Sequence, residues 1–259
     1  MQEIESESRF VWHQLFFILK LPVLLIQILF GRKKASELLN PLRDFVRFIF
    51  EPKITITLII INVIVFILEI FYFTQEQILN LAFKPSDILQ FNYIPIISSW
   101  FLHASLAHIA GNMLFLFIFG RIVEKEFGLK MLLVYFGSAI ISDIVSAFAG
   151  QGGIGASGAI AGLISTAILM HPFYFTYLIA IPLPIVLVGW LAIYSDITGI
   201  LMPKNDNIGH FAHLGGYIAI FALVFLFNRE QRHKMKIGAV INVLFVISLL
   251  FVYYYILRR

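Results

Sequence analysis

Residues Gly155–Gly162 read GASGAIAG and begin an apolar stretch that runs from Ser157 to Met170. Ser157 has small residues on both sides, so other groups can approach its hydroxyl from several directions. A helix is expected to begin here, and the first N–H groups of a helix have no partner within it. The stretch is also shorter than the ~20 residues that cross a membrane. We therefore expect a helix that starts below the membrane surface, at the bottom of a water-filled cavity.

The composition of the 259-residue chain excludes an ordinary soluble domain. Hydrophobic residues make up 60% of it and charged residues 13%, whereas soluble domains carry about 25% charged residues. We expect one polytopic membrane domain, whose net charge of +4 reports topology rather than nucleic-acid binding. The chain has no cysteine, which excludes disulfides and thiol chemistry. Residues 1–8 are acidic and polar, so we expect no cleavable signal peptide.

Seven apolar segments are candidate membrane spans. They are Ile54–Phe73, Leu106–Ile122, Leu132–Phe148, Ser157–Met170, Tyr174–Leu201, Ile208–Phe227 and Gly238–Leu257. The irregular residues before the short fourth span, Gln151–Ile154, can lie at depth only where protein or a cavity satisfies their backbone. The pattern predicts an all-α membrane protein.

The N-terminal 53 residues differ from the rest of the chain. From residue 36 to residue 50, one helical face is apolar and the opposite face is charged, which is typical of an amphipathic helix at the membrane interface. Residues 10–30 are very apolar but carry one narrow polar stripe, made by His13, Lys20 and Gln27. This stripe favours a helix that lies at the interface over one that crosses the membrane.

Lysine and arginine predict the side on which each loop lies, because cytoplasmic loops carry an excess of them. One basic group precedes the first span, a second lies between the sixth and seventh spans, and a third follows the second span. In that order they are Arg32, Lys33, Lys34, Arg43, Arg47 and Lys53; Arg229, Arg232, Lys234 and Lys236; Arg121, Lys125 and Lys130. With all three groups cytoplasmic, Ser157 is expected toward the outer face.

Ser157 taken alone is better explained by helix packing, because small residues at this spacing let helices approach. A serine hydroxyl becomes a nucleophile beside a base, and His210 and His213 lie near the outer start of the sixth span. Gly216 follows His213 by one turn, so this helix can come close enough for a Ser–His hydrogen bond of about 2.6–3.2 Å. We expect His213 rather than His210 to be the base, because only His213 has Gly216 beneath it.

His108 and Asn112 lie four residues apart in the second span, so they share a helical face. Both donate hydrogen bonds, and preorganised donors stabilise the oxyanion that forms in acyl transfer. The backbone N–H of Ser157 is a third candidate donor. His103 lies further out, where we expect it to orient the loop. No acidic partner for a histidine is evident, so the sequence predicts a dyad that needs no cofactor and no metal.

Four motifs in this order resemble those of the rhomboid intramembrane serine proteases. They are HASLAHIAGN at 103–112, GRIVEKEFG at 120–128, GASGAIAG at 155–162 and AHLGG at 212–216. The resemblance implies a six-helix bundle with a Ser–His dyad in a water-filled cavity open to the outer side. It implies that Ser157 is the nucleophile and His213 the general base, with His108 and Asn112 on the oxyanion side.

The resemblance also implies an architecture and partners. Residues 1–53 would form an interfacial region, 54–228 a six-span catalytic core, and 229–259 a cytoplasmic loop with an extra span. Glu124 and Gly128 match a structural motif. The expected partners are single-span membrane proteins, cleaved near the outer face of a prokaryotic inner membrane, and the lipid bilayer; we expect no nucleic acid.

Two points concern the base and access to it. Many family members carry an aromatic residue four positions after the serine, where this chain has Ala161, so the group that orients His213 is not evident. The loop Met202–Asn207 and the outer half of the fifth span are expected to gate access. Trp190 and Ile197 are candidates for the contact between the fifth and second spans.

Other functions stay open at this point. An inactive scaffold of the same family would usually lack the serine or the histidine. A metal site would use histidines without an H-E-x-x-H motif or a carboxylate partner: His103, His108, His210 and His213. An aspartyl protease would use Asp143 and Asp196 without a G-x-G-D motif, and polar partners explain both better. A transporter is disfavoured because the halves are not repeated.

Overall fold

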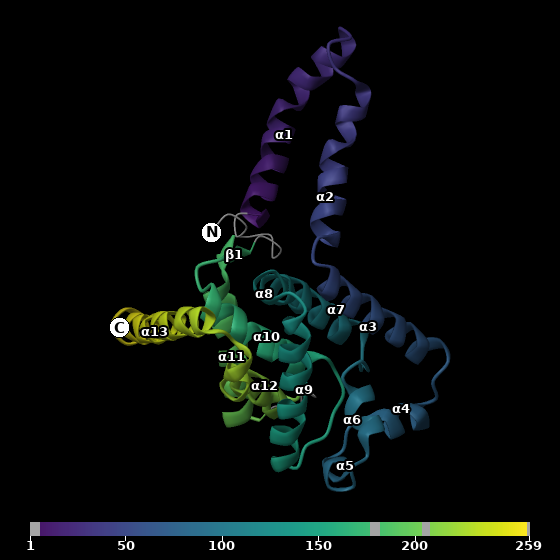
Figure 1. Ribbon diagram of the computed structural model, residues 1–259, viewed down its shortest axis with the longest axis vertical. Helices are drawn as coiled ribbons and strands as arrows, with labels where there is room; N and C mark the ends of the chain where they lie inside the picture. Colours follow the sequence, from purple (N-terminus) through teal and green to yellow (C-terminus); the bar gives the residue numbers. More distant parts are fainter. Residues whose placement is uncertain (1–5, 177–181, 204–207, 258–259) are drawn as a thin grey trace.

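A computed structural model describes residues 6–176, 182–203 and 208–257, and Figure 1 shows a helical bundle from which two segments project. The elements follow in chain order: α1 (Ser6–Leu29), η1 (Ala35–Leu39), α2 (Asn40–Phe50), α3 (Lys53–Phe71), α4 (Gln75–Leu81), α5 (Pro85–Leu89), α6 (Tyr93–Ser99), α7 (Leu106–Phe115), η2 (Leu116–Gly120), α8 (Arg121–Phe127), α9 (Lys130–Phe148), α10 (Ser157–Met170), β1 (Phe175–Thr176), β2 (Leu183–Pro184), α11 (Ile185–Leu201), α12 (His210–Leu223), η3 (Val224–Leu226), α13 (Arg229–Val252) and η4 (Tyr253–Leu257).

The prediction of an all-α, multi-pass membrane protein is confirmed. Five segments of the described chain are long and apolar enough to cross a membrane: Phe10–Leu29, Lys53–Phe71, Leu106–Phe127, Lys130–Phe148 and Arg229–Tyr255. Three shorter apolar helices accompany them, at Ser157–Met170, Ile185–Leu201 and His210–Leu226. The first segment, which we expected to lie at the interface, is therefore also long enough to span.

Helix α10 packs against both α9 and α12, which also pack against each other (Figure 1). Gly158 and Gly162 back onto Ser142 and Ser138 of α9, and a Cβ at either glycine would overlap the serine side chain. Gly216 of α12 lies against the backbone of α10, where a Cβ would collide with a carbonyl oxygen. The close approach of these two helices that the sequence predicted is thus confirmed.

Helices α1 and α2 form a hairpin that projects from the bundle (Figure 1). The ring of Phe48 in α2 is buried and stacks on that of Phe10 in α1, with 4.4 Å between centroids. The guanidinium of Arg121 lies 3.9 Å from the Phe48 centroid and donates to Glu51 at 3.1 Å. Four other apolar side chains of α2 are exposed, as expected for an interfacial helix: Leu42, Phe45, Val46 and Phe50.

Residues of all three basic groups lie at one end of the bundle, as their predicted common side requires. The Arg121–Glu51 contact joins the start of α8 to the end of α2. Lys234 of α13 contacts Glu126 of α8 at 3.3 Å. Because α9 runs from this end to the other, the start of α10 and hence Ser157 lie at the opposite end. Which end faces the cytoplasm stays a prediction.

The predicted start of the fifth span is wrong. We expected a helix from Tyr174, but α11 begins at Ile185. Before it, β1 and β2 pair antiparallel, with Phe175 opposite Pro184 and Thr176 opposite Leu183. Prolines at 182 and 184 hold the chain extended and remove two N–H donors, so the helix cannot begin earlier.

The loop predicted after residue 228 is also wrong. Residues 229–237 form the first turns of α13, which is one continuous helix. Asn228 caps it, because its Oδ1 accepts from the backbone N–H of Gln231 at 2.8 Å and the Gln231 side chain accepts from the Asn228 N–H in return. Such a capping box starts a helix. The basic residues at 229–236 are therefore part of the same helix as the seventh span.

Helix α13 is joined to α10 and α11 by one polar side chain. Asn242 donates to the carbonyl oxygen of Ile168 at 2.9 Å and accepts from the Trp190 Nε1–H at 2.7 Å. Trp190 therefore faces α13, and it is wrong as a contact between the fifth and second spans. The predicted gate loop Met202–Asn207 lies mostly outside the described residues, which omit 204–207.

Glu124 ties the start of α3 to α8. Its carboxylate accepts from the backbone N–H groups of Ile54 and Thr55 at 2.9 and 2.8 Å, and from Thr55 Oγ1 at 2.7 Å. The first N–H groups of a helix have no partner within it. Glu124 therefore supplies the cap that α3 lacks in its own sequence.

We expect Glu124→Ala to lower the free energy of unfolding by about 1–3 kcal/mol, because it leaves partly buried donors unpaired. Thermal unfolding in detergent measures the change. Glu37→Ala is the matched control, since Glu37 forms an exposed ion pair with Lys33 and surface pairs contribute little. Equal losses in the two variants would contradict the capping role.

Candidate active site

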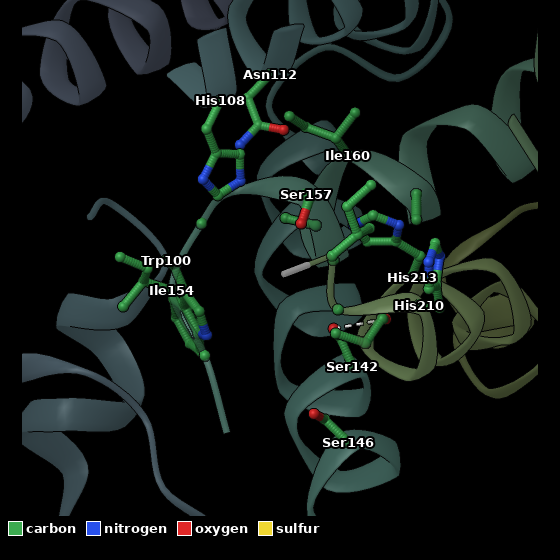
Figure 2. Close-up of a pocket in the computed structure, with 18 of the residues that line it drawn as sticks. Trp100, His108, Asn112, Ser142, Ser146, Ile154, Ser157, Ile160, His210 and His213 are labelled. Atoms are coloured by element: carbon green, nitrogen blue, oxygen red, sulfur yellow. Dashed lines mark hydrogen bonds between the residues drawn. The ribbon is translucent and has the colours of Figure 1, made fainter. Parts of the chain in front are cut away.

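A cavity of about 870 Å³ opens where α7, α10, α11 and α12 meet. Its lining includes all four residues that the sequence singled out, Ser157, His213, His108 and Asn112. Figure 2 shows Ser157 between two groups, with His108 and Asn112 on one side and His213 and His210 on the other. The fold thus brings three separate motifs to one water-accessible space.

The chain that leads to Ser157 is held by backbone hydrogen bonds. Phe83 and Gly153 exchange two of them, at 3.1 and 3.0 Å, and the Gly155 N–H donates to the carbonyl oxygen of Ser99 at 2.8 Å. Gly155 has φ +129°, a conformation that L side chains rarely adopt. The irregular backbone predicted at depth is therefore satisfied by protein, and it fixes where α10 begins.

Ser157 is the first residue of α10 and is half-buried. Residues 157–159 all line the cavity. The N–H groups at a helix start have no partner within the helix, and the helix dipole adds a positive end there. A negative oxygen that develops beside Ser157 would therefore be stabilised by α10 itself.

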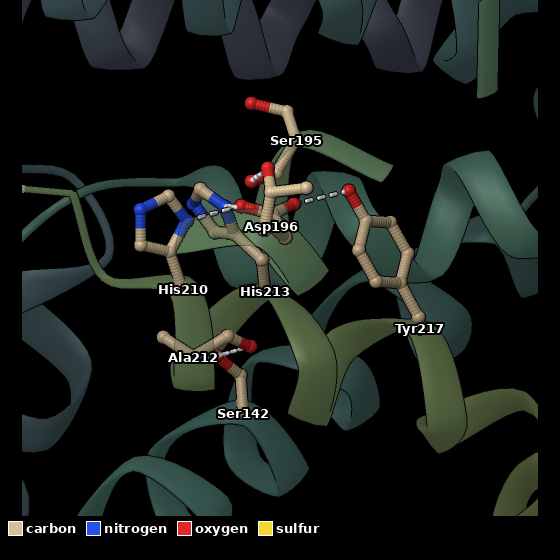
Figure 3. Close-up of polar contacts among 8 residues, drawn as sticks. Ser142, Ser195, Asp196, His210, Ala212, His213 and Tyr217 are labelled. Carbon is tan, nitrogen blue, oxygen red and sulfur yellow. Dashed lines mark hydrogen bonds and ion pairs between the residues drawn. The ribbon is translucent and has the colours of Figure 1, made fainter. Parts of the chain in front are cut away.

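His213 lies on α12, and its ring nitrogen Nδ1 is hydrogen bonded to a carboxylate. Its Nδ1 is 2.8 Å from Oδ1 of Asp196, a buried residue of α11. A carboxylate can only accept, so His213 carries a proton on Nδ1 and its Nε2 is an acceptor. Figure 3 shows Asp196 between the two histidines and Tyr217.

Asp196 is the site residue that the sequence interpretation missed, and the expectation that no acidic partner exists is wrong. The acid lies on another helix, 17 residues before His213, so neither spacing nor motif joins the two. One signal was present: His210, His213 and Tyr217 are three and four residues apart and share a face of α12. Three polar groups on one face of a membrane helix need polar partners on a neighbouring helix, but the pattern does not say which.

His210 contacts the same carboxylate. Its Nδ1 is also 2.8 Å from Asp196 Oδ1, and the residue is buried. Its ring packs on Gly199 of α11, where a Cβ would overlap the imidazole. His210 is therefore held between α11 and α12, which agrees with the expectation that it is not the base.

The two predicted oxyanion donors flank Gly155. A Cβ at Gly155 would lie 2.9 Å from His108 Nε2 and 3.5 Å from Asn112 Nδ2. Asn112 Nδ2 is buried and makes no hydrogen bond within the described part of the chain. His108 Nδ1 accepts from the Ala104 N–H over a long 3.4 Å contact, which leaves the proton on Nε2. Two donors are thus held beside the chain that leads to Ser157.

His103 does not share this arrangement. It is buried, and its ring Nδ1 contacts the carbonyl oxygen of Phe101 at 3.1 Å. Its backbone N–H donates to Glu69 at 3.1 Å. Burial lowers the pKa of His103 to about 4, so the ring is neutral at pH 7. These contacts fit the expected role of orienting the loop before α7.

The structure bears on the two alternative sites, the aspartyl protease and the metal site, in different ways. Asp143 accepts from Trp100 Nε1 at 2.7 Å and Asp196 binds the α12 residues, so each carboxylate has polar partners of its own. Asp196, His210 and His213 offer ligand atoms within 4.8 Å of one another, a spacing open to a metal ion. The expectation that the histidines lack a carboxylate partner is therefore wrong.

The Rhomboid domain family model matches residues 90–230 of this chain, which is more than half of it. The chain belongs to the rhomboid family. It is 30% identical over 206 residues to RHOMBOID-like protein 12, mitochondrial, of Arabidopsis thaliana. The aligned region covers 71% of this chain and 61% of that relative. It is 28% identical over 192 residues to Rhomboid-like protease 3 of Toxoplasma gondii, which covers 68% of each.

Rhomboid proteins are in general intramembrane serine proteases, although some members are inactive. The activity of this chain and the roles of its residues are therefore proposals, argued below from the geometry of the site. A further relative is Rhomboid-like protein 11, chloroplastic, of Arabidopsis thaliana, 26% identical over 154 residues, 54% of each chain. Because relatives carry organelle names, the predicted prokaryotic inner membrane stays a prediction.

We expect His210→Ala to keep substantial cleavage activity, because His213 and Tyr217 still bind Asp196. We expect His213→Ala to lose it, because His213 is the histidine with the α10 backbone beside the next turn of its helix. The two variants are assayed side by side on one single-span substrate. An inactive His210→Ala beside an active His213→Ala would exchange the two roles.

Proposed function

We propose that this chain is an intramembrane serine endopeptidase, with Ser157 as nucleophile and His213 as general base. The observation that supports it most is the state of His213. Its Nδ1 is occupied by Asp196 at 2.8 Å, so Nε2 is left as the acceptor, in the cavity that Ser157 also lines. A serine hydroxyl beside such an acceptor is the arrangement of an activated nucleophile.

The proposed reaction proceeds in two halves. Ser157 Oγ attacks the scissile carbonyl carbon while His213 Nε2 takes the hydroxyl proton. His213 then gives that proton to the leaving amine as the C–N bond breaks, which leaves an acyl-enzyme. Water from the cavity attacks the ester with His213 again as base, and Ser157 is released.

The oxyanion of each tetrahedral intermediate would be held by three donors: His108 Nε2, Asn112 Nδ2 and the Ser157 N–H. Their support is the position of the two side chains beside Gly155 and the lack of a partner for Asn112 Nδ2 among the described residues. Donors fixed in advance stabilise developing charge at no reorganisation cost.

The proposed substrates are single-span membrane proteins, cleaved near the outer face of the membrane. We propose that this membrane is a prokaryotic inner membrane. A carbonyl inside a helix is already hydrogen bonded, so the substrate must unwind locally to present it. Segments with glycine or other helix-weakening residues near the outer interface should be preferred.

We expect Ser157→Ala and His213→Ala each to abolish cleavage of a reconstituted single-span substrate. The two groups act as a unit, so losing either costs about as much as losing both. Gel analysis of the cleaved substrate and thermal unfolding of each variant separate loss of chemistry from loss of fold. Retained cleavage by pure Ser157→Ala protein would contradict the assignment and favour another nucleophile, whereas no cleavage by the wild-type protein would favour the inactive scaffold.

We expect His108→Ala and Asn112→Ala to slow cleavage about 10²–10³-fold without eliminating it, which is the usual effect of removing one oxyanion donor. The measurement is kcat of each variant on the same substrate. Chelators should leave the wild-type rate unchanged. If EDTA stops the wild-type reaction, the metal site is the better explanation.

A further inference from the structure

We propose that Asp196 is the positioning residue of the catalytic base, so that the serine and histidine work with a third, acidic member. The inference rests on the proposed function and extends it. Asp196 would fix the tautomer and orientation of His213 and stabilise the imidazolium that forms when Ser157 loses its proton.

Three donors surround the Asp196 carboxylate. His210 Nδ1 and His213 Nδ1 each lie 2.8 Å from Oδ1, and the Tyr217 hydroxyl donates to Oδ2 at 2.8 Å. Three donors around one carboxyl group match its ionised form, which only accepts. Both oxygens are held, so the side chain cannot rotate away from His213 without losing hydrogen bonds in a buried site.

The need for such a group comes from Ala161. Where many family members have an aromatic ring four residues after the serine, this chain has a methyl group, and it lies at the α10–α12 contact, 2.7 Å from where a Cβ of Gly216 would be. No ring from this position can stack on His213. Among the described residues, Asp196 supplies the hydrogen bond that orients the His213 imidazole, and the His210 ring lies beside it with 6.4 Å between centroids.

His210 and Tyr217 hold Asp196 in place. They lie one turn before and one turn after His213 on the same face of α12, and the His210 ring is wedged against Gly199, one turn after Asp196 on α11. Residues on both sides of His213 along α12 therefore hydrogen bond to the carboxylate. The other titratable groups that line the cavity are His108 of α7 and Asp143 of α9.

The test compares Asp196→Asn and Asp196→Ala in liposomes with a single-span substrate, over a range of pH. An asparagine can keep the accepting oxygen toward both imidazoles but removes the charge. We expect kcat of Asp196→Asn to fall with little change in KM, and its pH profile to differ from that of the wild type. Asp196→Ala should lose about 10²-fold or more in kcat and be slower than the asparagine variant.

Asp143→Asn is the matched control, since Asp143 is the other buried carboxylate of the cavity and contacts Trp100 rather than a histidine. Its pH profile should match the wild type. Wild-type kcat and pH profile in both Asp196 variants would overturn the positioning role while leaving Ser157 as nucleophile. Activity in Ser157→Ala would instead overturn the proposed function, so the two failures are distinguishable.

A measurement on the wild type keeps the proposal testable if the Asp196 variants do not fold. Nitrogen NMR of histidine-labelled protein, at a pH where His213 is neutral, reports which ring nitrogen carries the proton. We expect the Nδ1–H tautomer for His213. An Nε2–H tautomer, or wild-type activity that requires an ion removable by chelators, would overturn the proposal.

Discussion

The close contact between α10 and α12 is the constraint on which the site depends. Gly216 lies so near the backbone of α10 that a Cβ would collide with the carbonyl oxygen of Gly158. The same pair of helices carries Ser157 and His213, and their separation sets whether a proton can pass between them. Backbones approach this closely only where side chains are absent, so the glycines of the two motifs are as necessary as the catalytic side chains.

Several polar groups inside the bundle bond across helices as well as along them. Ser142 Oγ donates to the Ala212 carbonyl oxygen at 2.7 Å, and Ser165 Oγ donates to that of Tyr217 at 2.9 Å. Together they hold α9 and α10 to the helix that carries the base. Asn242 does the same for α13, and Asp196 for α11. In hydrocarbon an unpaired polar group is costly, so each of these contacts fixes helix position as well as stability.

The sequence predicted the features that depend on local pattern. Apolar length gave the spans, and the motifs around Ser157, His213, His108 and Asn112 gave residues that the fold does bring to one cavity. The late start of α11 and the early start of α13 were missed, although the prolines before Ile185 and the Asn228–Gln231 pair signalled them.

Features that depend on how helices rotate against one another were beyond sequence reasoning. Asp196 and His213 are in contact because α11 and α12 pack with these two residues facing each other. No spacing along the chain reveals that packing. Trp190 faces α13 instead of the second span for the same reason. In both cases the residue type was noted and its partner was not, because membrane helices present polar and aromatic residues to several possible neighbours.

The most direct test of the account is to locate the nucleophile chemically. The protein in detergent is treated with a fluorophosphonate, which modifies activated serines, and the adduct is mapped by mass spectrometry of peptides. The account predicts one adduct, on Ser157, that is absent from His213→Ala protein. An adduct on another residue, or unmodified Ser157 in protein that cleaves its substrate, would contradict it.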